Sequence, residues 1–154
     1  MKLYLIFIIA LAGVVSIFGS SITNQTDEKY YHVEPFFKTN WYKANAYCRA
    51  IGMHLLSISS KEESDKVKQV IRDLGTVDET FWTSGTKLGD TVYYWLTTGK
   101  KLLFTDWAEN QPNTYYGGRR CIELWHSADL KWSNDDCDDI YRVICERPTN
   151  LTPQ

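Results

Sequence analysis

The pattern of apolar and polar residues changes character along this chain of 154 residues. An apolar run occupies residues 3–18, residues 41–74 repeat apolar positions at helical spacing, and short apolar runs separated by turn-forming residues follow from residue 80 onward. Helices and strands that come in blocks, rather than in alternation, are typical of α+β folds. We therefore expect one α+β domain and not an alternating parallel sheet.

Each of the two expected helices has a residue suited to capping its start and a glycine suited to ending it. Asn40 precedes the first helix, expected over residues 41–51. Ser60 and Glu63 form a capping box at the start of the second, which a glycine at position 75 ends. Residues at helical spacing give each helix an apolar face: Ala44, Tyr47, Cys48 and Ile51 in the first, and Val67, Val70, Ile71 and Leu74 in the second.

Strands are indicated by short runs of aromatic and β-branched residues. These runs are residues 30–33, 81–83, 92–96, 101–104, 122–125 and 141–145. Between Phe104 and Cys121 the chain is rich in Asn, Gly and Pro and shows neither helical nor strand spacing. Loops longer than about 12 to 15 residues are uncommon unless they serve a function. We therefore expect a binding site in this segment.

The apolar run near the N-terminus follows Lys2 and precedes small residues at positions 19–21, which is the order of a secretory signal peptide. A retained membrane anchor is the alternative, since about 18 apolar residues begin to span a bilayer. We expect residues 1–21 to be removed, 22–29 to form an N-terminal segment, 30–147 the domain and 148–154 a tail, with no membrane span in the mature chain. Glycosylation sequons at Asn24 and Asn150 flank the domain and fit a secreted, extracellular protein.

Secretion makes four cysteines a disulfide framework, because no Cys-x-x-Cys pair indicates a metal site. Four cysteines allow three connectivities, which the residues alone leave open. The formal net charge is −2 and the basic residues are scattered, so we expect no nucleic-acid partner. The three histidines form no His-Glu-x-x-His motif and no serine lies in a nucleophile elbow, so we expect no enzyme and no catalytic residues.

Three segments together resemble the C-type lectin domain family. They read Trp-Ala-Glu-Asn-Gln-Pro-Asn over residues 107–113, Cys-Ile-Glu-Leu over 121–124 and Trp-Ser-Asn-Asp-Asp-Cys over 132–137. The resemblance covers roughly residues 30–147 and implies two helices, short antiparallel sheets and a long binding loop. It also implies buried tryptophans at positions 82, 95, 107 and 132, and the disulfides Cys48 to Cys145 and Cys121 to Cys137.

Members of that family hold a calcium ion, and through it two sugar hydroxyls, with a triplet that contains a cis proline and with further acids nearby. The matching positions here carry no carboxylate: they are Gln111, Asn113, Arg119, Ser133 and Asn134. A slip of one residue would restore an Asn-Asp pair at Asn134 and Asp135, and the acidic run that follows is either a solvated turn or a set of cation ligands. Because calcium affinity depends on carboxylate count, we expect calcium to bind weakly if at all.

Arg119 stands where the family has a ligating glutamate. Its guanidinium either takes the place of the cation, donating hydrogen bonds to neighbouring side chains, or points into solvent from the Gly-Gly-Arg-Arg segment. Tyr115, Tyr116, Trp125 and His126 are candidates for a metal-free aromatic sugar platform.

The resemblance implies a secreted lectin that binds glycans or glycoproteins. Its expected sugar contacts, which are also the expected metal ligands, are Gln111, Asn113, Asn134 and Asp135. The Gln-Pro-Asn triplet combines features of mannose-type and galactose-type sites and names neither sugar. The alternative is a calcium-independent module of the same fold that binds a protein partner.

Overall fold

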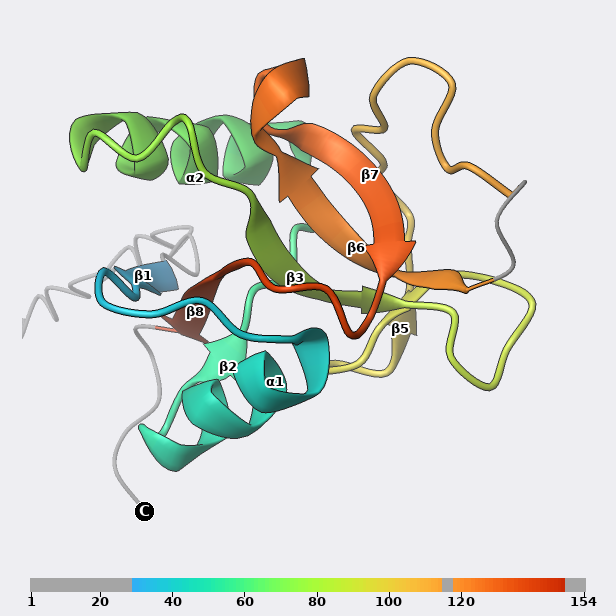
Figure 1. Ribbon diagram of the computed structural model, residues 1–154, viewed down its shortest axis with the longest axis horizontal. Coiled ribbons are helices and arrows are strands. Elements are labelled where there is room, and N and C mark those ends of the chain that lie inside the picture. The colour runs from blue at the N-terminus through green and yellow to red at the C-terminus, as the bar shows by residue number, and fades with distance from the viewer. Residues whose placement is uncertain (1–28, 115–117, 149–154) are drawn as a thin grey trace, which may run out of the picture.

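The computed structural model describes residues 29–114 and 118–148 (Figure 1). The predicted signal peptide, the sequons at Asn24 and Asn150, and the loop tyrosines Tyr115 and Tyr116 lie outside these residues. The described elements are β1 (Lys29–Val33), α1 (Trp41–Ala50), β2 (His54–Leu55), α2 (Lys61–Asp73), β3 (Phe81–Thr86), β4 (Tyr94–Trp95), β5 (Lys100–Lys101), β6 (Arg119–Trp125), the short 3-10 helix η1 (His126–Ala128), β7 (Lys131–Asp136) and β8 (Arg142–Pro148). None of the helices in the described ranges is long and apolar enough to cross a bilayer.

Both helices start where the sequence predicts. The Asn40 side chain accepts a hydrogen bond from the Lys43 amide at 3.0 Å, and the Ser60 hydroxyl accepts one from the Glu63 amide at 3.1 Å. The reciprocal half of the capping box differs from the prediction, because the Glu63 carboxylate accepts from the Ser59 amide instead. Glycines with positive φ follow both helices, as expected.

The buried faces of the helices differ from the prediction at their C-terminal ends. Ile51 is 42% exposed and Leu74 is 57% exposed, because each is the residue that caps its helix and turns away from the core. The buried face of α1 includes Trp41, Ala44 and Cys48.

The sheet is organised around β3, whose six residues are all buried. β3 pairs antiparallel with β4 and β6 and parallel with β8, while β8 also pairs with β1 and β2. In Figure 1 the two helices lie on opposite sides of β3, and the long loop between β5 and β6 lies beside β7. The C-type lectin fold predicted from the resemblance is confirmed.

β7 is the main element that the strand pattern missed. Its residues read Lys-Trp-Ser-Asn-Asp-Asp, so apolar alternation is nearly absent and the acidic end reads as a turn. Pairing with β6 nevertheless runs from Trp125 opposite Lys131 to Arg119 opposite Asp136. Other strands shift by a few residues: β5 is two residues long, and β6 begins three residues earlier than expected.

Both predicted disulfides are confirmed. Cys48 bonds to Cys145, which ties α1 to β8, and Cys121 bonds to Cys137, which ties β6 to the segment after β7. The tryptophans at positions 82, 95 and 132 are buried as expected. Trp107 is only partly buried, because it packs edge-on against Trp132 from the start of the long loop. The Cys121–Cys137 bridge lies at one end of the β6–β7 pair, which carries the candidate site, and the contact of Trp107 with Trp132 lies toward the other end.

Candidate functional site

The long loop runs alongside β7 and is attached to it at the base. Ala108 donates its amide to the Trp132 carbonyl at 2.8 Å, and Trp132 donates to the Asp106 carbonyl at 2.8 Å. The Asp106 carboxylate in turn accepts from Lys68 at 2.7 Å and from Ser64 at 3.0 Å, both on α2. The base of the loop is therefore held between α2 and β7.

Asn134 attaches the loop a second time, further along β7. Its side chain is fully buried and makes three hydrogen bonds to backbone groups. The amide oxygen accepts from the Asn113 amide at 2.6 Å, and the amide nitrogen donates to the carbonyls of Asn113 at 2.9 Å and Arg119 at 3.0 Å. A single buried amide thus joins the loop to the first residue of β6.

The Gln111–Pro112 peptide bond is cis, as the resemblance implies. The Gln111 side-chain oxygen accepts from the Asn113 amide at 2.9 Å, so this amide is shared between Gln111 and Asn134. Both Gln111 and Asn113 remain half-buried. The triplet is therefore held in one conformation by side chains of the protein itself.

Asp135 is the centre of an ion pair and a hydrogen-bond network. The Arg119 Nε lies 3.1 Å from one carboxylate oxygen, and the Asp136 amide donates to the same oxygen at 3.0 Å. The Tyr141 hydroxyl donates to the other oxygen at 2.7 Å, and burial raises the pKa of this hydroxyl. Arg119 therefore pairs with Asp135 and does not simply point into solvent.

The structure joins Gln111, Asn113 and Asn134 through hydrogen bonds at one end of the β6–β7 pair. Asp135, the next residue of β7, contacts Arg119 and Tyr141 instead. Trp125 and His126 are not among these residues, because they lie at the other end of β6. Six residues of strand separate Trp125 from Arg119, which is about 20 Å at the usual rise per residue. Trp125 and His126 therefore form no common platform with Gln111 and Asn113.

The donor set at this position does not fit a tight calcium site. Within residues 29–114 and 118–148, no group of three or more His, Cys, Asp or Glu side chains is arranged to hold a metal ion. Asn134 already uses its amide on backbone groups, and Asp135 is engaged by Arg119, Tyr141 and the Asp136 amide. Calcium prefers six to eight oxygen ligands, several of them carboxylates, so this end of β7 offers too few.

Glu123 is a buried acid next to this network. Glu123 is only 3% exposed, and its Oε2 atom has no hydrogen-bond partner in the described part of the chain. Burial, followed by the charge of Asp135, raises the pKa of Glu123 to about 8. At neutral pH the side chain is therefore mostly protonated and adds little charge to the site.

Replacing Glu123 by glutamine is expected to stabilise the protein progressively, relative to the wild type, as the pH rises from 5 to 8. With a folded pKa of about 8 against an ordinary value of 4.5, the folded protein keeps a proton that the unfolded chain releases. The stability associated with this proton is full below pH 4.5 and is lost as the pH rises toward 8. Since each pKa unit corresponds to about 1.4 kcal/mol, the relative gain should be about 2 kcal/mol or more.

Urea unfolding of both proteins at pH 5 and pH 8 measures this difference. Glu62→Gln, on the exposed side of α2, is the matched control because it removes the same group from a solvated position. An equal effect of Glu123→Gln at the two pH values would show that the carboxyl is ionised in the folded protein across this range.

The sequence did not indicate how two members of the network are placed. Tyr141 is the first residue of a predicted strand, and nothing in its neighbourhood marks it as a partner of Asp135. Glu123 is an acid in an apolar strand, and the strand pairing that faces it with Ser133 depends on β7, which the pattern missed. Arg119 was identified because its position departs from the family's motif.

Comparisons with known proteins agree with this geometry. The model of the lectin C-type domain matches residues 37–147. C-type lectin 37Db of Drosophila melanogaster is 31% identical over 150 residues, which cover 94% of this chain and 97% of the fly protein. The carbohydrate-recognition domain of the mouse scavenger receptor C-type lectin superposes with a TM-score of 0.68 at 27% identity, over 84% of this chain and 95% of that domain.

A solved structure described as a calcium-independent type II antifreeze protein shares the fold alone, with a TM-score of 0.66 at 24% identity over 78% of this chain and 86% of its own. Both the sheet arrangement and the sequence match therefore lead to one class of protein. The chain belongs to the C-type lectin domain family.

Proposed function

We propose that this protein binds carbohydrate at the surface formed by the Gln111–Asn113 triplet and the end of β7, without requiring a tightly bound calcium ion. The observation that carries the proposal is the way the loop is held. The Asn134 amide binds both backbone groups of Asn113, and Asp135, the next residue of β7, pairs with Arg119. The loop therefore has a fixed conformation that depends on protein groups.

Gln111 supplies a polar group suited to a sugar hydroxyl. Its oxygen is used inside the loop, and its amide nitrogen has no hydrogen-bond partner among the residues described. The side chain is half-buried, so the nitrogen is held in position rather than moving freely. A donor that is already oriented loses less conformational entropy when it binds a hydroxyl.

The family supports carbohydrate as the ligand, and the fold does not by itself demand calcium. A structural neighbour whose name states calcium independence has the same fold. Secretion, which follows from the expected signal peptide, is part of the same proposal and places the protein where it meets extracellular glycans.

Calcium is expected to bind the wild-type protein weakly, with a dissociation constant toward the 10⁻⁴ to 10⁻³ M that is usual for extracellular modules. The reason is the shortage of available carboxylates and the presence of the Arg119 cation. Calorimetric titration with calcium chloride measures the constant. A micromolar value would show that Asp135 and its acidic neighbours form a site despite Arg119.

A glycan array probed once with calcium and once with a chelator tests the proposed function. Signals that persist in the chelator support metal-free sugar binding. Signals that need calcium would contradict the metal-free part of the proposal. Silence under both conditions would favour the alternative, a module of this fold that binds a protein surface.

A further inference from the structure

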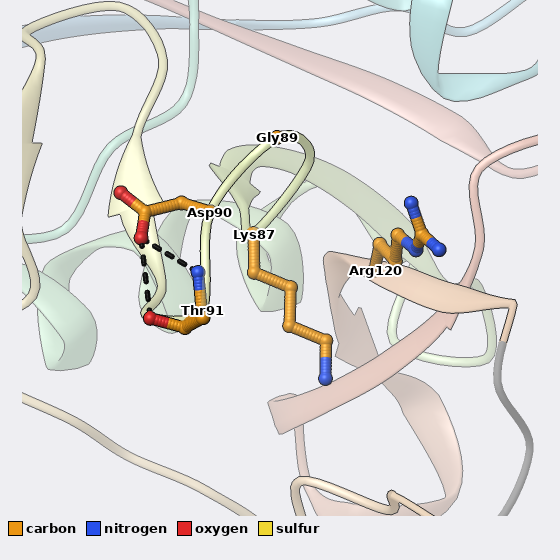
Figure 2. A pocket seen from close by; sticks show the side chains of 5 residues that line it. All are labelled: Lys87, Gly89, Asp90, Thr91 and Arg120. Atoms are coloured by element: carbon orange, nitrogen blue, oxygen red, sulfur yellow. Dashed lines mark hydrogen bonds between the residues drawn. The ribbon is translucent and has the colours of Figure 1, made fainter.

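A second feature lies where the turn between β3 and β4 meets the first residues of β6. A pocket of about 680 Å³ opens there, lined by Lys87, Gly89, Asp90, Thr91 and Arg120 (Figure 2). Arg120 directly follows Arg119, the residue that pairs with Asp135. None of its lining residues contributes to the network around Asp135 described above.

The backbones of the two cationic residues are fixed next to each other. Lys87 donates its amide to the Arg120 carbonyl at 2.9 Å, and the Thr86 hydroxyl donates to the same carbonyl at 3.0 Å. From these adjacent positions the side chains spread apart, and the Lys87 ammonium and the Arg120 guanidinium point in different directions in Figure 2. The Lys87 ammonium lies 5.3 Å from the centre of the Tyr93 ring, a cation–π contact that holds it in place.

The acid in the pocket does not neutralise these cations. The Asp90 carboxylate is turned onto its own backbone, where the Thr91 amide donates to it at 2.6 Å and the Val92 amide at 3.3 Å. In the described residues no carboxylate lies within 4.0 Å of the charged groups of Lys87 or Arg120. Both cations therefore remain available to a ligand, and Lys101 adds positive charge close to Asp90.

We propose that this pocket binds the anionic groups of an acidic glycan, as carboxylates or sulfate esters, next to the neutral sugar site. The inference rests on the proposed function and extends it, because it names a class of glycan for a second, separate site. Two cations that spread apart match anionic groups spaced along a polymer better than one small ion. The guanidinium of Arg120 can bind a carboxylate or sulfate through two parallel hydrogen bonds, and Lys87 acts as a point charge.

The positive charge of this pocket is local, unlike the extended basic surface of a nucleic-acid-binding protein. The net charge of the chain is −2, so attraction to an anion must come from this local pair and not from the protein as a whole. No sequence pattern indicates the pair, because Lys87 and Arg120 are far apart along the chain and are brought together by the pairing of β3 with β6.

Binding of dextran sulfate, polygalacturonate and uncharged dextran of matched length, measured at about 0.15 M salt, tests the proposal. The wild type is expected to bind at least one of the two acidic polymers and not the uncharged one. The double variant Lys87→Gln with Arg120→Gln should weaken that binding at least tenfold. Comparison of the two acidic polymers shows whether sulfate or carboxylate is preferred.

The control is the double variant Lys43→Gln with Arg49→Gln, which removes one lysine and one arginine from exposed positions on α1. It has the same net charge as the test variant and should change the affinity by no more than about twofold. Thermal unfolding of both variants checks that each is folded. No binding of either acidic polymer, or equal losses in the two double variants, would overturn the proposal.

These results also separate the pocket from the proposed function. A neutral glycan identified on the array should bind the Lys87 and Arg120 variant as it binds the wild type. If the wild type binds that neutral glycan but no acidic polymer, the pocket proposal fails and the proposed function stands. If acidic polymers bind through the pocket and no neutral glycan binds, the proposed function fails while the pocket stands.

Discussion

Replacing Arg119 by glutamate is expected to strengthen calcium binding at least tenfold, which corresponds to about 1.4 kcal/mol. In the wild type the guanidinium lies 3.1 Å from the Asp135 carboxylate and opposes a cation at the same position. The substitution changes the local charge by two units and places a second carboxylate beside Asp135. Because calcium affinity is set largely by the number of ligating carboxylates, the variant should bind it more tightly.

Titration calorimetry at equal ionic strength measures both proteins. Arg120→Glu is the matched control, since it makes the same change of charge one residue further along β6, in a side chain that lines the other pocket. It should raise the affinity much less than Arg119→Glu. Unchanged affinity in the Arg119 variant would mean that the missing ligands alone explain weak binding and that the ion pair has no part in it.

Replacing Asn134 by leucine is expected to lower the free energy of unfolding by about 3 kcal/mol and to reduce glycan binding at least tenfold. Leucine keeps a similar volume but removes the three hydrogen bonds of the Asn134 side chain to Asn113 and Arg119, each of which contributes about 1 kcal/mol. The Asn113 amide keeps Gln111 as an acceptor, so the loop is weakened rather than released.

Chemical unfolding gives the stability change, and glycan titration at a temperature where both proteins are folded gives the binding change. Thr114→Val, at an exposed position of the same loop, is the control and should alter neither quantity appreciably. If the leucine variant is less stable but binds glycan as well as the wild type, then the conformation of the Gln111–Asn113 triplet is not what positions the sugar.

The parts of the fold that depend on local signals could be predicted from the sequence. Asn40 and Ser60 cap their helices as expected, because a cap needs only an acceptor side chain at the right position. β7 could not be predicted, because it is held by pairing with β6 and by the burial of Trp132 rather than by any alternation of its own residues. Tertiary pairing of this kind overrides local strand propensity.

The candidate site shows the same division. Resemblance predicts Gln111, Asn113, Asn134 and Asp135 in one site; hydrogen bonds join the first three, while Asp135 contacts Arg119 and Tyr141. The resemblance did not predict that the Asn134 amide would donate to backbone carbonyls, or that the Tyr141 hydroxyl would donate to Asp135. These contacts join segments whose positions depend on β7. The pocket at Lys87 and Arg120 depends on strand pairing in the same way.

The central claim is that sugar binds at the triplet and the end of β7 without calcium. The most direct measurement is a titration of the isotopically labelled protein with its best array glycan in the presence of a chelator, followed by the backbone amide shifts. The account predicts saturable shifts that are largest at Gln111, Asn113, Arg119, Asn134 and Asp135. No shifts until calcium is restored, or shifts centred on Trp125 and His126 at the far end of β6, would contradict it.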